Sequence, residues 1–287
     1  MPRWLLFTLL AVVCWGIWAV LSKLVGDALT AVQMQALSTA GLLPVLVALG
    51  CSSPEADPGD RRRGAAVGAL AGGLTCLGNV ACYHALASGA KAATVVPLTA
   101  LYPLVTVLLA VAFLGERLHP IQWAGVALAL AAIGAFNVGS VEGMMNPWLA
   151  YALLPVALWG VSGLLQKIST DDTSGNRSAW WFLAAFVPVG IVLLAVDPLP
   201  AWPAARTCWL VAGLGLFFSL GNYAILLAFA NAGKASIIGP LASLYPLVSV
   251  PIAITLLHER ITPREAAGIA VALVAVAALA WPMERRS

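Results

Sequence analysis

Aromatic, amide and imidazole side chains recur inside the long apolar stretches of the 287-residue sequence. Asn79 and Tyr83 are four residues apart, so on a helix they share one face, and His84 follows directly. Side chains of these types hold small molecules through hydrogen bonds and ring contacts. The residues that we expect to line such a binding site are Trp15, Trp18, Asn79, Tyr83, His84, Tyr102, Trp159, Gln166, Asn222 and Tyr245.

The sequence lacks the residue sets that catalysis or metal binding requires. Of the three histidines, His119 and His258 fall at the edges of loops, and no nucleophile or metal constellation assembles around His84. No phosphate-binding loop of the Gly-x-x-x-x-Gly-Lys-Ser/Thr type occurs, so ATP hydrolysis is not expected. We therefore expect neither an enzyme nor a bound metal or cofactor.

The elements that position the binding residues must lie in lipid. The sequence is 61% hydrophobic and 9% charged, with a mean hydropathy of +0.94, whereas a soluble protein carries roughly a quarter charged residues. This composition excludes a soluble enzyme, a disordered protein and a secreted domain stabilised by disulfides. The net charge of +3 is too small to indicate nucleic-acid binding.

Ten apolar runs are long enough to cross a bilayer, which takes about 20 helical residues. They are expected at residues 4–24, 30–50, 65–88, 92–115, 120–139, 148–168, 178–196, 208–230, 235–257 and 263–282. The Lys and Arg residues divide ten to five between the two sides, with the excess on the side of the termini. Because cytoplasmic loops carry the positive excess, we expect a bacterial-type inner membrane protein with both termini in the cytoplasm.

The sequence also contains an internal duplication. Gly78-Asn79-x-Ala81 recurs as Gly221-Asn222-x-Ala224, and Leu101-Tyr-Pro-Leu-Val105 recurs as Leu244-Tyr-Pro-Leu-Val248, both 143 residues later. Each copy holds five predicted spans, an odd number, so the second copy enters the membrane from the opposite face. Inverted repeats of this kind build alternating-access transporters, which bind substrate near the membrane midplane. The predicted repeats are residues 1–141 and 142–287.

Residues that break the repeat symmetry are the best candidates for ligand recognition, because a ligand is rarely symmetric. Tyr83 and His84 are replaced by Leu226 and Leu227 in the second copy, and Gln166 lies in the second half. An alternative role for His84 is that of a hydrogen-bonded packing residue. For the tryptophans, the alternative is a position at the membrane interface or against lipid.

Prolines within the apolar runs predict sites of bending, because each removes a backbone hydrogen bond and frees a carbonyl. A static kink is one interpretation of each site. The recurrence of Tyr102-Pro103 as Tyr245-Pro246 favours a gating role instead. The predicted gating or kink residues are Pro97, Pro103, Pro240 and Pro246.

The paired motifs resemble those of the drug/metabolite transporter superfamily, specifically its ten-helix EamA-type branch. The resemblance covers residues 4–282 and rests on Trp15-Gly16, Trp159-Gly160 and the two Leu-Tyr-Pro-Leu-Val motifs, each followed by Glu-Arg-x-x-Pro. It implies an inverted-repeat bundle with a central cavity lined by the first four helices of each half. The fifth and tenth helices would be peripheral supports. Family members move amino acids, amines, nucleotide sugars or drugs, so the resemblance does not fix the substrate.

Together these features predict an all-α polytopic membrane protein, with ten transmembrane helices in two inverted five-helix repeats, that acts as a secondary transporter. We expect export of amino acids or related small polar metabolites by facilitated diffusion, because no Asp or Glu lies mid-span to relay protons. The alternative is a carrier of cationic amines or drugs coupled to protons through His84, since imidazole titrates near neutral pH. Glu116 and Glu259 are further proton candidates, or else they cap helices and pair with the adjacent arginines. The expected partners are a small-molecule substrate and the lipid bilayer, with no nucleic acid and no obligate protein partner.

Overall fold

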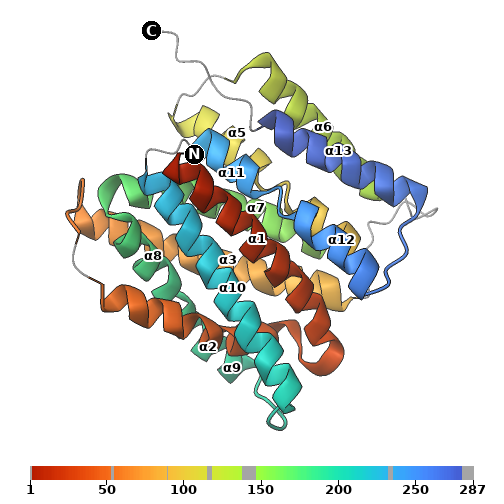
Figure 1. Ribbon diagram of the computed structural model, residues 1–287, viewed down its shortest axis with the longest axis horizontal. Helices are drawn as coiled ribbons and strands as arrows, with labels where there is room; N and C mark the ends of the chain where they lie inside the picture. Colours follow the sequence, from red (N-terminus) through yellow and green to blue (C-terminus); the bar gives the residue numbers. More distant parts are fainter. Residues whose placement is uncertain are drawn as a thin grey trace.

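The computed structural model describes residues 2–52, 55–88, 90–114, 118–137, 147–231 and 235–279, and within them every regular element is a helix (Figure 1). The elements of the first half are α1 (Arg3–Val25), η1 (Gly26–Ala28), α2 (Ala31–Gly50), α3 (Arg61–Ala87), α4 (Ala92–Thr99), α5 (Pro103–Leu114) and α6 (Pro120–Asn137). Those of the second half are α7 (Pro147–Asp172), α8 (Gly175–Ala184), α9 (Phe186–Val196), α10 (Ala205–Ala230), α11 (Ala235–Ala242), α12 (Pro246–Leu256) and α13 (Pro263–Leu279).

Eight segments of the described chain are long and apolar enough to cross a membrane. Three of these segments consist of two helices separated by a short break: α4 with α5, α8 with α9, and α11 with α12. The two remaining helices are shorter, since α13 has 17 residues and the described apolar part of α6 is Pro120–Ala132. The structure confirms a multi-pass, all-helical protein, and the count of ten spans stays a prediction.

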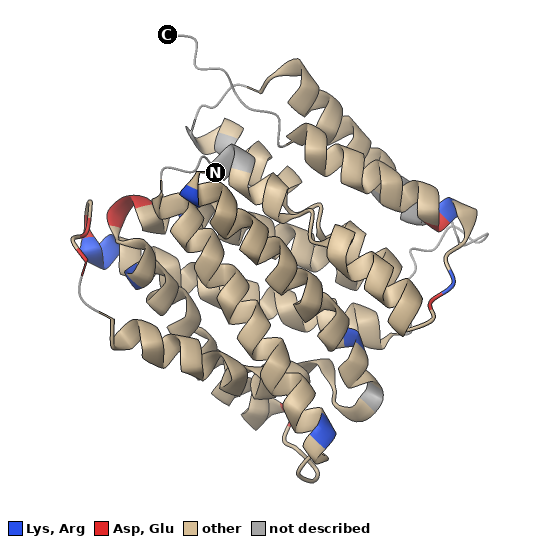
Figure 2. Cartoon of the chain, viewed as in Figure 1, with Lys and Arg blue, Asp and Glu red and all other residues tan. Residues whose placement is uncertain are grey.

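Charged residues gather at the helix ends, and the middle of the bundle is free of them among the residues that Figure 2 colours. Polar side chains at the helix ends explain where two of the helices begin. Asp60 accepts hydrogen bonds from the backbone N–H groups of Arg62 and Arg63 at the start of α3. Thr30 and Gln33 form a reciprocal capping box at the start of α2. Such caps satisfy N–H groups that have no partner within the helix.

The two halves are packed against each other through equivalent helices. The first helix of each half lies against the third of the other, so α1 packs on α10 and α7 packs on α3. Glycines allow equally close approaches elsewhere: Gly16 of α1 lies against Val248 of α12, and Gly160 of α7 lies against Val105 of α5. In both places an added Cβ would stand only 2.5 Å from the Cβ of the valine. Equivalent positions in the two halves therefore make equivalent contacts.

Two broken helices occupy equivalent places in the halves. α4 ends at Thr99 and α5 begins at Pro103, while α11 ends at Ala242 and α12 begins at Pro246. Proline has no backbone N–H, so it fits the first turn of a helix after a break. The predicted kinks at these two prolines thus coincide with real interruptions. Pro97 and Pro240 instead lie within α4 and α11, and a gating role for all four remains a prediction.

The pair α6 and α13 stands at one edge of the bundle (Figure 1). Gly125 of α6 brings the two backbones close together, because a Cβ there would lie 2.9 Å from the backbone nitrogen of Leu279. The Gln122 side chain also donates to the Leu279 carbonyl at 3.2 Å. None of the described residues of this pair lines the cavity described below.

Candidate functional site

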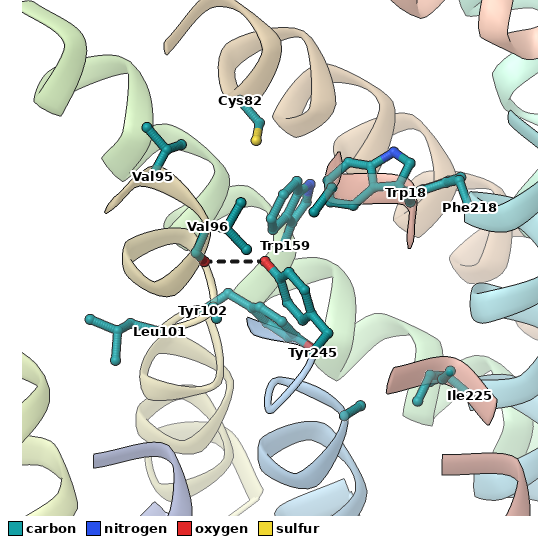
Figure 3. Packing of buried hydrophobic residues seen from close by; sticks show 14 of the residues in the cluster. Trp18, Cys82, Val95, Val96, Leu101, Tyr102, Trp159, Phe218, Ile225 and Tyr245 are labelled. Atoms are coloured by element: carbon teal, nitrogen blue, oxygen red, sulfur yellow. Dashed lines mark hydrogen bonds between the residues drawn. The ribbon is translucent and has the colours of Figure 1, made fainter. Parts of the chain in front are cut away.

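A cavity walled by aromatic rings lies between the two halves, surrounded by the helices that pair across them (Figure 3). Its lining residues are Trp15, Trp18, Thr75, Tyr102, Thr106, Trp159, Gly163, Gln166, Phe218, Asn222, Ile225, Phe229, Gly239 and Tyr245. The open space inside is about 50 Å³, well below the roughly 300–1,000 Å³ of typical ligand pockets. The rings must therefore move apart before a metabolite can enter.

Two ring pairs related by the repeat form opposite parts of the wall. The Trp15 and Tyr245 rings meet edge to face, with centroids 6.1 Å apart and planes at 83°. The Trp159 and Tyr102 rings meet in the same way, at 6.2 Å and 86°. Each pair joins a tryptophan from the first helix of one half to the tyrosine at the helix break of the other half. Movement at either break would therefore displace a ring of the cavity wall.

Glycines on the facing helices make room for the two tryptophans. The Trp159 indole lies against Gly78 of α3, and the Trp15 indole lies against Gly221 of α10. A Cβ at either glycine would come within 2.5 Å of the indole nitrogen, which is closer than atoms can pack. The Gly-Asn motif found in both sequence repeats therefore includes the surface on which each tryptophan ring rests.

Trp18 extends the wall from the Trp159 ring to the Phe218 ring. Its centroid lies 5.8 Å from the Trp159 ring and 5.8 Å from the Phe218 ring. Its indole N–H donates to the hydroxyl of Tyr83 at 2.9 Å, and both side chains are buried. Because the hydrogen bond fixes the ring orientation, Trp18 presents its apolar face to the cavity.

Amide and hydroxyl groups supply the polar part of the wall. Gln166 donates to the Ser162 hydroxyl at 3.3 Å, and Asn222 donates to the Phe218 carbonyl at 2.9 Å. The Tyr245 hydroxyl lies 3.2 Å from the Thr99 hydroxyl. It also donates to the Val96 carbonyl at 3.5 Å (Figure 3). Within the described part of the chain, no charged side chain and no histidine lines the cavity. The site is equipped to bind rings and neutral polar groups.

Seven of the ten residues predicted to bind a small molecule line this cavity: Trp15, Trp18, Tyr102, Trp159, Gln166, Asn222 and Tyr245. Asn79 and Tyr83 are buried, at 1% exposure each, but they lie behind the wall. Tyr83 acts through its hydrogen bond to Trp18. Asn79 has a buried side-chain oxygen with no hydrogen-bond partner among the described residues.

His84 lies apart from the other predicted binding residues, because it does not line the cavity. It is exposed on the outer surface of α3, where its ring packs on that of Tyr151, with centroids 4.0 Å apart. Successive helical residues point about 100° apart, so once Tyr83 faces the interior its neighbour must face outward. The structure therefore gives no support to a proton-coupling role for His84 inside the cavity.

Several lining residues were missed by sequence reasoning. Thr75 lies one helical turn before Asn79 and bonds to the Ser162 hydroxyl at 2.6 Å. Phe218 lies at the repeat position of Thr75. Thr106 donates to the Gly160 carbonyl at 2.8 Å. The i, i+4 spacing from Asn79 could have identified Thr75, and the repeat would then have led to Phe218.

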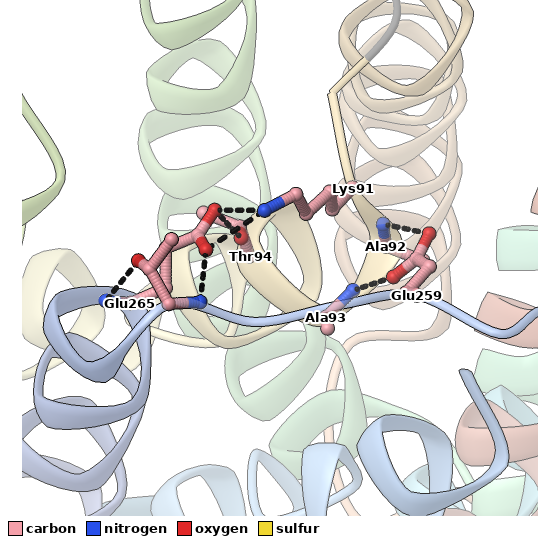
Figure 4. Close-up of polar contacts among 7 residues, drawn as sticks. Lys91, Ala92, Ala93, Thr94, Glu259 and Glu265 are labelled. Carbon is pink, nitrogen blue, oxygen red and sulfur yellow. Dashed lines mark hydrogen bonds and ion pairs between the residues drawn. The ribbon is translucent and has the colours of Figure 1, made fainter. Parts of the chain in front are cut away.

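Acidic side chains fasten one end of the bundle (Figure 4). The Glu259 carboxylate accepts from the backbone N–H groups of Ala92 and Ala93 at 2.9 and 2.8 Å, so it caps α4. Lys91 pairs with Glu265 of α13 at 2.8 Å. This supports the capping interpretation of Glu259, although the capped helix belongs to the other half. Glu116, the repeat equivalent of Glu259, lies outside the described residues.

Comparison with known proteins agrees with this geometry. The sequence profile of the EamA-like transporter family matches residues 2–138 and 146–281. A riboflavin transporter of Rhizobium johnstonii is 33% identical over 132 residues, which are 43% of this chain and 40% of that protein. The uncharacterized transporter YojE of Bacillus subtilis is 30% identical over 163 residues, which are 55% of this chain and 51% of that protein. The chain thus spans about half the length of the curated relatives it matches.

A solved structure, described only as a crystal structure of a protein, shares the fold. It matches 95% of this chain and 94% of its own, with a TM-score of 0.68 and 19% sequence identity. The family profile covers both halves of the chain, including the tryptophans, the glycine motifs and the tyrosine breaks that form the cavity. The chain therefore belongs to the EamA-like transporter family.

Proposed function

We propose that this transporter is a secondary carrier that exports small polar metabolites, amino acids or related compounds, across a bacterial inner membrane. The observation that carries the proposal is the uncharged, ring-walled cavity enclosed by two matched halves. In this proposal the chain is a carrier and not an enzyme, and both termini lie in the cytoplasm.

The wall chemistry favours substrates with a flat apolar face and no net charge. The edge-to-face pairs leave indole and phenol surfaces for stacking, and ring–ring contacts contribute about 0.5–1.5 kcal/mol each beyond the buried area. Gln166 and Asn222 can bind neutral polar groups. Among amino acids, those with large aromatic or aliphatic side chains fit this wall best.

Alternating access follows from the two broken helices. Each break carries a tyrosine of the cavity wall, so opening one break removes a ring from one side only. In this proposal the narrow cavity, about 50 Å³, belongs to a conformation between the two open states. Because the halves pack through equivalent glycines, the inward-open and outward-open states can be similar in free energy.

The site favours facilitated diffusion, in which the concentration gradient of the substrate drives transport. Proton-coupled carriers use a carboxylate, imidazole or basic side chain in the substrate pathway, and the described lining residues include none of these. A carrier of cationic amines is disfavoured for the same reason, since no carboxylate faces the cavity within the described residues. Aromatic rings alone would have to hold the cation.

A second candidate substrate is a flat heterocycle of the riboflavin type. One relative, similar over 43% of this chain, is a riboflavin transporter. A neutral ring system with several polar atoms also suits indole walls with amide groups between them. The two candidates differ in size and in the number of polar atoms, so one assay separates them.

The test is counterflow into liposomes that contain the purified protein and excess unlabelled compound. The panel is labelled tryptophan, leucine, aspartate, riboflavin and tyramine. We expect exchange of the neutral amino acids or of riboflavin, and at least a tenfold loss with Trp159→Ala. The matched control is Trp209→Ala, at a position that is 80% exposed. Exchange of aspartate or tyramine alone, or equal losses in both variants, would contradict the proposal.

A further inference from the structure

Two cavities away from the ring-walled site adjoin each other along α3. The first, of about 370 Å³, lies near the beginning of α3 and is lined by polar residues that include Glu55, Arg61 and Asn176. The second, of about 540 Å³, is a groove between α3 and the α8–α9 segment. Trp181 lines both. One continuous surface therefore carries a polar pocket at its end and an apolar groove below it.

The groove lies on the outside of the bundle and is apolar throughout. Leu70 and Leu77 are 55% and 49% exposed along its α3 side. A Cβ added at Gly73, which also lines it, would meet no atom within 4 Å. In a membrane protein this surface faces acyl chains, and a groove with open space admits one of them.

The shape of the groove follows from the break in the second segment. α8 packs tightly on α3, because Gly72 lies directly against the Phe182 carbonyl. The helix is interrupted at Ala185, and Pro188 follows in α9. Beyond this break α9 has little contact with α3. The groove thus opens where α9 departs from α3.

The polar pocket holds two opposite charges that are not used elsewhere. Arg177 of its lining is paired with Asp57. Arg61 and Glu55 also line the pocket, yet neither forms an ion pair with any residue that the structure describes. Glu55 accepts one hydrogen bond from Asn176 at 3.0 Å, through one carboxylate oxygen. A guanidinium and a carboxylate are therefore both open to a ligand, at separate points.

We propose that this composite surface is a binding site for a phospholipid with a phosphoethanolamine headgroup. The phosphate would bind Arg61, the ammonium group would bind Glu55, and one acyl chain would lie in the groove. Arg61 and Leu77 are sixteen residues apart, or about 24 Å along the helix, so headgroup and chain fit on one molecule. Trp181 lies where the polar pocket meets the apolar groove, and tryptophan favours such boundaries in membrane proteins.

The opposite charges select this headgroup over other lipids. A glycerol headgroup offers no cation to Glu55, and a trimethylated ammonium cannot donate a hydrogen bond to it. Arginine is suited to phosphate because its planar group donates two parallel hydrogen bonds. The lipid site is separate from the ring-walled cavity, so its test does not depend on the proposed transport function.

The experiment is native mass spectrometry of the purified full chain with added palmitoyl-oleoyl lipids. The probes are phosphatidylethanolamine, phosphatidylcholine and phosphatidylglycerol. We expect one retained phosphatidylethanolamine, bound about tenfold more tightly than the other two, as one charge-assisted hydrogen bond implies. Glu55→Gln should remove the preference while leaving phosphatidylcholine binding unchanged. Arg61→Gln should weaken all three lipids about tenfold, and the neighbouring Arg62→Gln should weaken none.

A second pair of variants tests the groove. Gly73→Leu fills the open space and should lower the affinity for all three lipids about tenfold, whereas Ala127→Leu, exposed on α6 away from both cavities, should not. Thermal unfolding without added lipid checks that each variant is folded. Equal binding of the three lipids, equal losses in Arg61→Gln and Arg62→Gln, or an unchanged affinity in Gly73→Leu would overturn the proposal. Displacement of lipid by millimolar inorganic phosphate would instead identify a phosphate site and overturn the lipid assignment.

Discussion

Trp15 and Trp159 occupy equivalent positions in the two halves, with equivalent neighbours, yet their hydrogen bonding differs. Each rests on a glycine and meets a tyrosine edge to face. The Trp159 N–H donates to the Thr75 carbonyl at 3.3 Å. The Trp15 N–H is buried in the wall without a partner among the described residues. The repeat thus preserves the scaffold while leaving one donor unused.

The surroundings of the two rings explain this difference. Thr75 and Ser162 lie near Trp159, and their repeat equivalents near Trp15 are Phe218 and Trp18. The Phe218 carbonyl, which corresponds to the acceptor used by Trp159, accepts instead from Asn222. The Trp159 N–H is therefore satisfied within the protein, whereas the Trp15 N–H, buried against Gly221, has no partner among the described residues. A substrate acceptor atom would reach the Trp15 N–H only when the rings move apart to admit it.

The largest expected effect tests whether the scaffold is equivalent in both halves. Gly160→Val and Gly16→Val each force a side chain into a valine of the facing helix, and such overpacking costs about 1–3 kcal/mol. We expect both variants to lower the thermal midpoint in detergent by similar amounts. Gly73→Ala, which meets open space, is the control. A strong loss in only one half would show that the halves are not mechanically equivalent.

The next prediction separates the two indole N–H groups. Trp159→Phe removes a hydrogen bond within the protein, so it should destabilise the empty carrier by about 1 kcal/mol. Trp15→Phe removes none, so the empty carrier should keep its thermal midpoint. Its transport affinity should fall about fivefold to tenfold, because a substrate loses its donor. The measurements are the thermal midpoint and the half-saturating substrate concentration of each variant. A lower thermal midpoint in Trp15→Phe, with an unchanged midpoint in Trp159→Phe, would contradict the comparison.

Some features of the fold and of the cavity wall could be predicted from the sequence, and others could not. The Tyr-Pro repeats predicted the helix breaks, because proline acts on the local backbone. The shared face of Asn79 and Tyr83 was also predicted, and both are buried. The sequence could not reveal that Trp18 covers Tyr83, because that contact joins residues 65 positions apart. Equally, the free N–H of Trp15 depends on which acceptor Asn222 uses.

A smaller effect is expected at the end of the bundle where Glu259 of the second half caps α4 of the first half. Glu259→Ala removes the cap on α4, and loss of a cap costs about 0.5–2 kcal/mol. We expect a lower thermal midpoint and faster labelling of a cysteine introduced at Thr94, at the base of α4. Arg260→Ala, at an exposed position in the same loop, should change neither. Equal effects of the two substitutions would indicate that loop charge, and not the cap, holds this end.

The smallest effect concerns the asymmetry that the sequence made most conspicuous. His84 corresponds to Leu227 in the repeat, so His84→Leu makes the halves alike at this position. Because the ring lies on the outer surface against Tyr151, the variant should transport within about twofold of the wild type, since surface substitutions typically change stability by under 0.5 kcal/mol. Counterflow with and without an imposed pH gradient is the measurement, with Trp15→Phe as the variant whose transport affinity is expected to fall. A gradient response that the wild type shows and His84→Leu lacks would restore proton coupling through this residue and shift the important asymmetry from the cavity wall to the lipid-facing surface.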